Sequence, residues 1–344
     1  MRPLTLQRVI LQCALLALIL FVVVVIALKF GAVKVSLFGL GHDLIQALLG
    51  QTSGISSDYG MIVIDIRLPR ILLAIFVGAS LAVAGTSFQA LLRNPLADPY
   101  ILGVSSGAGV GAIIAIILQP YLPASVGLLA TPLGAFLGAA VTITAVYLLG
   151  IRAGQIDSST LLLGGVITGS FLFALIQFLM SSVTGRDMRS AIFWLMGDLS
   201  TPIQTGLRWI LVVGFFAAAG AIYTTAGDLN LLLSGEKEAM HLGVDVNRVR
   251  LVVYIAASLL TGFAVSVSGA IGYIGIFVPH AMRWIYGSDH RVLLPTAAFG
   301  GAIALVIADT LARTIVAPTD LPVGAVTAVA GAPLFIYLLR RRTA

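Results

Sequence analysis

Charged residues are scarce in this sequence. Asp, Glu, Lys and Arg make up 10% of its 344 residues, whereas a typical soluble domain carries about 25%. Apolar residues make up 59%, and they recur in long runs from one end of the chain to the other. So few charges cannot cover a water-exposed surface, which excludes cytosolic enzymes and extracellular binding modules. The composition predicts a polytopic protein embedded in a lipid bilayer.

Cysteine is almost absent as well. The single residue Cys13 excludes an intramolecular disulfide and a cysteine-based metal cluster, and we expect no metal-ligating residues. No lysine follows a glycine, so the chain lacks the G-x-x-x-x-G-K-[ST] loop that cradles ATP phosphates and does not hydrolyse ATP itself. The segment 103–107 matches the G-x-S-x-G pattern of hydrolases, but it opens a membrane helix, so we expect no catalytic residues.

Charge-free runs predict about ten transmembrane helices, since about 20 residues cross a bilayer. The first run is too long for a signal peptide and is interpreted as an uncleaved helix. Glycines and a proline interrupt the run 251–282, which predicts one full helix and one shortened, irregular helix. The expected helices occupy 9–28, 71–92, two parts of 99–151, 158–185, 209–227, two parts of 251–282, 292–316 and 321–339.

The distribution of basic residues predicts the orientation in the membrane. Lys and Arg are more frequent in the loops on the side of the N-terminus, and Arg340–Arg342 lie near the C-terminus, so both termini are expected inside the cell. Because the arginines are scattered between apolar runs, the net charge of +6 indicates topology and not nucleic-acid binding. G-x-x-x-G spacings at Gly107/Gly111 and Gly134/Gly138 predict close helix packing within the chain, with a dimer contact as the alternative.

Several sequence blocks together are similar to one protein family. The longest is IRLPRILLAIFVGASLAVAGTSFQALLRNPLADPYILGVSSGAGVG at 66–111. It is followed by GYIGIFVPHAMRW at 272–284, SDHRVLLP at 288–295, ADTLAR at 308–313 and LPVGAVTAVAGAPLFIYLLRR at 321–341. In this order the blocks closely resemble the FecCD-type permeases, which are the membrane subunits of type II ATP-binding-cassette (ABC) importers for cobalamin, ferric siderophores and haem.

The resemblance implies a single all-α transmembrane permease domain over 1–344, in the cytoplasmic (inner) membrane of a bacterium or archaeon. It implies a homodimer with the transport pathway on its two-fold axis. The implied partners are two cytoplasmic ABC ATPase subunits, which use ATP and Mg, and a periplasmic or extracellular substrate-binding protein. This chain itself is expected to bind no cofactor. The implied cargo is a metal chelate, and the sequence does not choose between a ferric siderophore, haem and cobalamin.

Arg67 and Arg70 flank Pro69, which suits the first turn of the second helix. Arg67 and Arg70 oppose the helix dipole there, so an acidic partner is expected, and Asp65 or lipid headgroups could supply it locally. Arg313 lies one turn beyond Asp309, which allows an i,i+4 ion pair within one helix. The resemblance implies a different role for all three arginines: they would receive carboxylates of the binding protein.

The segment 228–247 belongs to the longest polar stretch on the inner side. Ser234 is expected to cap a short helix over 236–242, and Gly243 to end it. The alternative to a protein contact is a loop lying on lipid headgroups. The resemblance makes this the segment that docks in the ATPase cleft, with the coupling residues Leu231, Leu232, Ser234, Gly235, Glu236, Ala239, Met240, Leu242 and Gly243.

Two further inner segments are candidates for a gate. The turn 93–99 contains two prolines and joins the second and third helices, and Asp157 or Ser158 can cap the fifth helix. Turn and capping chemistry would explain both segments. The resemblance implies instead that Asn94, Leu96, Ser159 and Thr160 close the cytoplasmic end of the pathway.

An ion-coupled secondary transporter or a channel is the alternative function. Such a protein needs buried ionisable side chains that form a proton or ion relay. The sequence offers few, namely Asp309, His280 and Arg283, all near expected helix ends.

Overall fold

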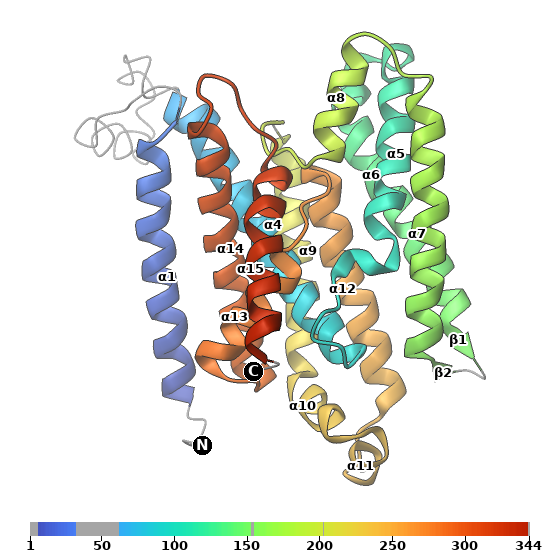
Figure 1. Ribbon diagram of the computed structural model, residues 1–344, viewed down its shortest axis with the longest axis vertical. Coiled ribbons are helices and arrows are strands. Elements are labelled where there is room, and N and C mark those ends of the chain that lie inside the picture. Colours follow the sequence, from blue (N-terminus) through green and yellow to red (C-terminus); the bar gives the residue numbers. More distant parts are fainter. Residues whose placement is uncertain (1–5, 32–61, 153–154, 202, 343–344) are drawn as a thin grey trace.

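The computed structural model describes residues 6–31, 62–152, 155–201 and 203–342, and this part of the chain is almost entirely helical. Ten longer helices make up most of the structure (Figure 1). They are α1 (Leu6–Lys29), α4 (Leu68–Leu91), α5 (Val104–Leu118), α6 (Ala124–Gly150), α7 (Ser158–Met180), α9 (Thr205–Thr224), α12 (Val246–Ser268), α13 (Ile274–Tyr286), α14 (His290–Thr314) and α15 (Val323–Arg342). The expected all-α architecture is confirmed.

Eight helices in the described part are long and apolar enough to cross a membrane. The two others are α13, which has 13 residues, and α15 at the C-terminal end. The glycine-rich stretch between α12 and α13 is therefore the interruption that the sequence predicts. It ends the full helix at Ser268 and leaves a shortened one after it.

Short elements connect the long helices. A π-helical turn η2 (Ile62–Arg67) leads into α4, and 3-10 turns η3 (Pro99–Leu102) and η4 (Gln119–Tyr121) border α5. The other connecting elements are helices α8 (Arg186–Leu195), α10 (Ala226–Ser234) and α11 (Glu236–His241) and the antiparallel strands β1 (Ile151–Arg152) and β2 (Gln155–Ile156).

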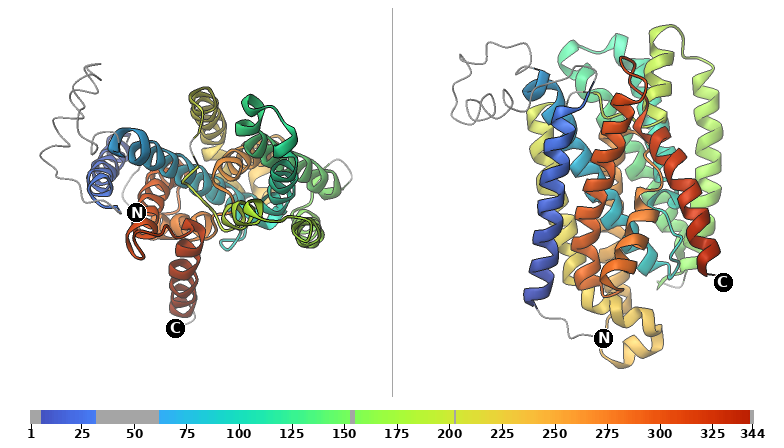
Figure 2. Two further views of the ribbon diagram at one scale, coloured as in Figure 1. Left: turned by 90° about the horizontal axis from the view of Figure 1, so that it is seen from above. Right: turned by 60° about the vertical axis from the view of Figure 1, so that its left-hand side comes forward.

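The two ends of the bundle differ in what they carry. Helix α1 begins and α15 ends at the same end, and α10, α11 and the β1–β2 hairpin lie there too, while α8 lies at the opposite end (Figures 1 and 2). We call these the inner and the outer end, following the orientation that the loop charges predict. The placement agrees with an even number of crossings.

Helix α4 forms the centre of the bundle. Of its most apolar stretch, 83% is buried inside the chain, and it packs against α12, α13 and α14. Glycines permit this close approach: a Cβ at Gly78 would overlap the backbone of Gly301, and a Cβ at Gly85 would overlap that of Gly275. Small residues let membrane helices approach closely, so they set the position of α4.

The G-x-x-x-G spacings have the intramolecular role that the sequence predicts. Gly107 of α5 faces Gly138 of α6, and Gly111 faces Gly134, with no room for a Cβ at these positions. These glycines therefore join α5 and α6 of one chain and do not present a free face to a second copy.

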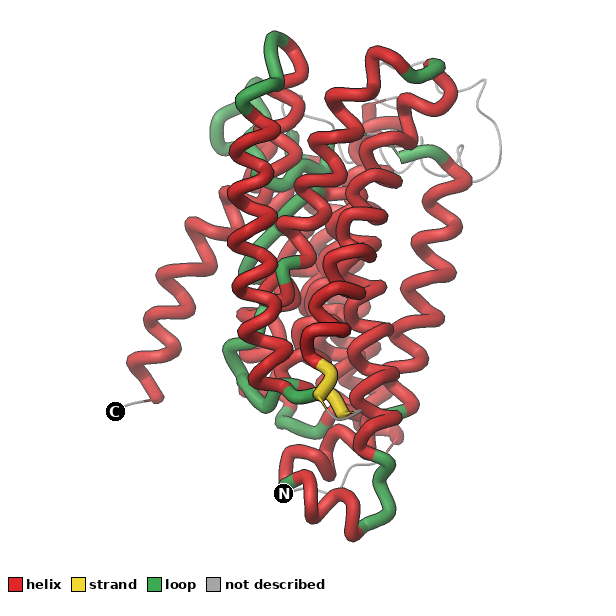
Figure 3. Tube along the Cα trace, turned by 90° about the vertical axis from the view of Figure 1, so that its right-hand side faces the viewer, coloured by secondary structure: helices red, strands yellow, loops and turns green. Residues whose placement is uncertain are grey.

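Helix α15 departs from the bundle. It leaves the outer end beside α14 and leans away from the other helices as it approaches the inner end (Figure 3). It packs against α13 and α14.

Candidate functional site

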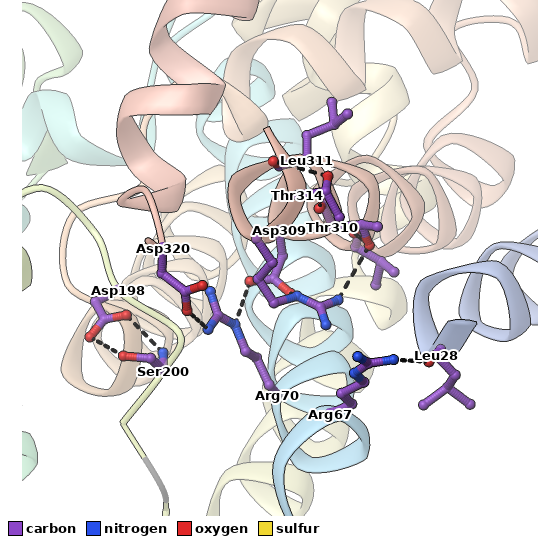
Figure 4. Close-up of polar contacts among 12 residues, drawn as sticks. Leu28, Arg67, Arg70, Asp198, Ser200, Asp309, Thr310, Leu311, Thr314 and Asp320 are labelled. Carbon is purple, nitrogen blue, oxygen red and sulfur yellow. Dashed lines mark hydrogen bonds and ion pairs between the residues drawn. The ribbon is translucent and has the colours of Figure 1, made fainter. Parts of the chain in front are cut away.

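The first turn of α4 places two arginines at the outer end. Arg67 is in the N-cap position, and a proline follows in the first turn, as the sequence predicts. The guanidinium of Arg70 donates through Nε to Asp309 Oδ1 at 2.7 Å and through Nη1 to Asp320 Oδ2 at 2.6 Å (Figure 4). Its acidic partners thus lie 239 and 250 residues away along the chain.

Arg313 completes an ion-pair cluster around Asp309. Its Nε lies 2.9 Å from Asp309 Oδ2, in a geometry that is not a hydrogen bond, which confirms the expected i,i+4 pair. Arg67 lies beside this cluster and donates through Nη1 to the carbonyl oxygen of Leu28 at 2.7 Å (Figure 4). The three arginines predicted for docking therefore lie together, although Arg67 ends η2, Arg70 belongs to α4 and Arg313 belongs to α14.

Burial distinguishes these arginines from an open docking surface. Arg67, Arg70 and Arg313 are 4%, 8% and 6% exposed, and Asp309 is fully buried. The accessible member of the cluster is Asp320, whose side chain is 42% exposed. A carboxylate from another protein would reach Arg70 most directly by displacing Asp320.

The helices α10 and α11 form the predicted coupling segment at the inner end. The main-chain N–H of Gly243 donates to Met240 and that of Val244 to Ala239, at 2.9 and 3.0 Å. This is the Schellman pattern, so Gly243 ends the helix as predicted. At the other end of α11, a Cβ at Gly235 would overlap the Glu238 carboxylate.

The prediction for Ser234 is wrong. Ser234 is the last residue of α10, and Gly235 occupies the N-cap position of α11 without any side-chain cap. The apolar residues before Ser234 continue the helix that begins at Ala226, because their buried face packs on the bundle. The serine therefore lies inside a helix instead of before one.

The predicted apolar contact surface is only partly correct. Leu232 and Ala239 are 4% and 0% exposed and belong to the chain's own core, so they are packing residues. The accessible apolar side chains are Leu233, Met240 and Leu242, at 47%, 52% and 67%. Leu231 is half-buried against the core, so these three side chains form the exposed apolar surface of the segment.

A side-chain network missed by the sequence analysis fastens α10 to α14. Asn230 donates through Nδ2 to Asp289 Oδ1 at 2.8 Å, and its Oδ1 accepts from the main-chain N–H of His290 at 2.9 Å. Asp289 also caps α14 by accepting from Arg291 N–H. An aspartate directly before a helix can be recognised in the sequence as a cap, so Asp289 could have been found. Its hydrogen bond with Asn230 depends on the tertiary fold and could not.

Hydrogen bonds from main-chain N–H groups to nearby side chains stabilise the turn that follows α4 at the inner end. Asn94 Oδ1 accepts from the Leu96 N–H at 3.0 Å, and Asp98 Oδ1 accepts from the Tyr100 N–H at 2.8 Å. Burial raises the pKa of the Asp98 carboxyl to about 6, and the bond from Tyr100 opposes this shift. Leu96 is 40% exposed, so the turn presents an apolar side chain at the inner end.

The start of α7 is capped as expected. Asp157 Oδ1 accepts from the main-chain N–H of Thr160 at 2.7 Å and from its hydroxyl at 2.5 Å. Ser159 is exposed beside it, and η3 packs on α7. The predicted gate residues therefore lie on two segments joined through η3. No group of three or more His, Cys, Asp or Glu that could hold a metal ion occurs among the described residues.

Known proteins match nearly the whole chain. The sequence profile of the FecCD transport family matches residues 18–341. The uncharacterised ABC transporter permease YvrB of Bacillus subtilis is 44% identical over 85% of this chain and 83% of its own length. The cobalamin import permease BtuC of Halobacterium salinarum is 44% identical over 84% and 76%. The hemin transport permease HmuU of Yersinia pestis is 42% identical over 81% and 83%.

A solved structure agrees with these sequence matches. An inward-facing ABC transporter of the metal-chelate type superposes with a TM-score of 0.79 at 30% identity, and the match covers 96% of this chain and 99% of the other. The helical bundle, the sequence blocks and these relatives give one result. The chain belongs to the FecCD transport family, whose named relatives are permease subunits of ABC importers.

Proposed function

We propose that this chain is the membrane permease of an ABC importer that moves a metal chelate into the cell. The cargo class is a ferric siderophore, haem or cobalamin. The observation that carries the proposal is the superposition of the whole bundle on a metal-chelate transporter. Relatives named for cobalamin and hemin transport support the same cargo class.

The proposed complex contains two copies of the chain, two cytoplasmic ATPase subunits that use ATP and Mg, and an external binding protein. It lies in the cytoplasmic membrane of a bacterium or archaeon. The divergence of α15 from the bundle (Figure 3) supports a second copy, because it leaves a long helix with few neighbours in its own chain. Light scattering of the purified complex tests the two-fold stoichiometry.

At the outer end, carboxylates of the binding protein dock on Arg67, Arg70 and Arg313. The clustering of the three side chains supports this role. Because the arginines are buried, the ion pair between Asp320 and Arg70 must break before a carboxylate of the binding protein can bind Arg70. Replacing Asp320 with Asn should therefore tighten association and steepen its dependence on salt. Unchanged affinity at low salt would contradict docking at this cluster.

At the inner end, the ATPase docks on the surface formed by Leu233, Met240 and Leu242, and the other residues that the resemblance assigns to coupling hold that surface in place. Its position beyond the helical bundle supports this role (Figure 1), and so does the exposure of the three apolar side chains. We therefore still assign the ATPase contact to this segment. Leu232 and Ala239 are not contact residues, because they are buried.

The inner gate consists of Leu96 as an apolar plug and of Asn94, Ser159 and Thr160 as a polar collar, each present twice in the dimer. The exposure of Leu96 and Ser159 at the inner end supports it. Cysteines at Leu96 or Ser159 in a Cys13→Ala background should cross-link to their two-fold mates in one nucleotide state. An intact dimer without any cross-link would refute the gate.

The test of the function is to isolate the chain with its partners. We expect an ABC ATPase to co-purify, and we expect the cognate binding protein to retain a ferric siderophore, haem or cobalamin, which its absorption spectrum and mass identify. A permease that purifies without any ATPase, and takes up its cargo on an ion gradient, would support the secondary transporter instead. Asp309 offers little for an ion relay, because Arg70 and Arg313 both pair with it.

A further inference from the structure

One carboxylate at the inner end joins three elements. Glu236, the first residue of α11, lies with Oε1 2.6 Å from Arg250 Nη1 on α12. Its Oε2 lies 3.4 Å from Arg93 Nη2. Arg93 opens the turn that carries Asn94 and Leu96, so Glu236 connects the coupling segment directly to the proposed gate.

The backbone of Arg93 is unusual. Its φ is +48°, and its N–H and that of Asn94 donate to Ala90 and Gln89 at 3.2 and 3.1 Å. Arg93 thus fills the left-handed position that ends α4, where glycine is the common residue. A left-handed conformation is costly for a residue with a Cβ, so local backbone geometry does not explain an arginine here. The contact of its side chain with Glu236 does.

The two ion pairs differ in exposure. The side chain of Arg250 is 10% exposed, and its short contact holds Glu236 on α12. The side chains of Arg93 and Glu236 are 39% and 32% exposed, and their contact is longer. An exposed pair contributes little to folding stability and is easily broken and re-formed. The Arg93 contact is therefore suited to change when α11 moves.

We propose that Glu236 transmits the displacement of α11 to the gate turn through Arg93, with Arg250 as its fixed point. Glu236 and Arg93 are positioning residues, since neither touches cargo or nucleotide. The inference rests on the proposed function, because it requires an ATPase that moves α11. Coupling requires that the contacts of the gate turn differ between two positions of α11. The Glu236 carboxylate meets this requirement, because it stays on Arg250 of α12 while its longer contact with Arg93 of the gate turn forms or breaks.

Three variants test the transmission: Glu236→Gln, Arg93→Gly and the double variant. Each is assembled with the ATPase and binding protein in proteoliposomes, where ATP hydrolysis and cargo uptake are measured together. We expect Arg93→Gly to leave assembly and ATP hydrolysis normal, and we expect uptake per ATP to fall at least about fivefold in all three variants. The double variant should be no worse than Glu236→Gln alone, because Arg93→Gly removes a contact that Glu236→Gln already weakens.

Arg93→Gly separates transmission from structure. Glycine adopts the left-handed conformation freely, so this variant should melt at or above the temperature of the wild type while its uptake per ATP falls. The matched controls are Glu238→Gln on α11 and Arg248→Gln on α12, which are exposed and form no ion pair within the described part of the chain. Both should couple like the wild type.

Two outcomes would overturn the inference. Arg93→Gly with normal uptake per ATP would show that the contact transmits nothing, and losses that add in the double variant would show that the two residues act separately. Failure of the proposed function is distinguishable, because wild-type vesicles would then show no ATP-driven uptake of a chelate.

Discussion

The buried charge cluster at the outer end gives the sharpest stability prediction. Asp309 is fully buried and pairs with Arg70 and Arg313, both of which are almost fully buried. Asp309→Asn keeps the size of the side chain but removes its charge. It therefore leaves two guanidinium groups close together without the carboxylate that offsets them.

The burial of Asp309 sets the expected loss of stability. Removing one partner of a buried ion pair costs about 3–5 kcal/mol, because the remaining charge stays desolvated. Asp320→Asn is the matched control: Asp320 binds the same Arg70 at a similar distance, but its side chain is 42% exposed. Asp320 is partly open to solvent and Arg70 keeps Asp309 when Asp320 is neutralised, so this control should lower stability much less than Asp309→Asn.

Thermal unfolding in detergent, followed by the fluorescence of the three tryptophans, measures the difference. We expect a clearly lower midpoint for Asp309→Asn and a much smaller decrease for Asp320→Asn. The triple variant Arg70→Met/Asp309→Leu/Arg313→Met should recover most of the loss, since apolar residues can replace a buried charge cluster. Equal midpoints for Asp309→Asn and Asp320→Asn would refute the reasoning.

Three further predictions concern packing, the coupling surface and pH. Gly85→Ala should lower the melting temperature because its Cβ meets the backbone of α13, whereas Gly220→Ala, with open space around it, should leave the temperature unchanged or raise it. Leu232→Asp should destabilise the purified chain, whereas Leu233→Asp should leave its melting temperature intact and reduce co-purification of the ATPase. Folding raises the pKa of Asp98 from 3.8 to about 6, so the folded state binds the proton more tightly and the free energy of unfolding falls as pH rises through this window. Asp98→Asn should reduce that fall in melting curves recorded across the same pH range.

Local features of the fold were predictable from the sequence. The proline after Arg67 marked the start of α4, Gly243 marked the end of α11, and the glycines after Ser268 marked the break before α13. Each of these signals acts within a few residues of its own position, because helix ends depend on local backbone geometry. The spacing of glycines also predicted close helix packing within the chain, because small residues let backbones approach closely. The structure shows this packing between α5 and α6.

Long-range features were not predictable in the same way. Asp320 lies 250 residues from Arg70, and no spacing rule connects them. Leu232 and Leu233 are neighbours of the same type, yet one is buried and the other exposed, because the docking angle of α10 decides which side faces the bundle. The burial of the three outer arginines likewise depends on how α1, α4 and α14 meet.

ATP-dependent uptake of a chelate by the reconstituted complex tests the central claim most directly. Proteoliposomes that hold the permease with its ATPase would receive the cognate binding protein loaded with a radiolabelled ferric siderophore, haem or cobalamin. We expect uptake that requires ATP on the side of the membrane where the ATPase subunits lie. This uptake should persist when ion gradients are collapsed. Uptake driven by an ion gradient without the ATPase would contradict the account.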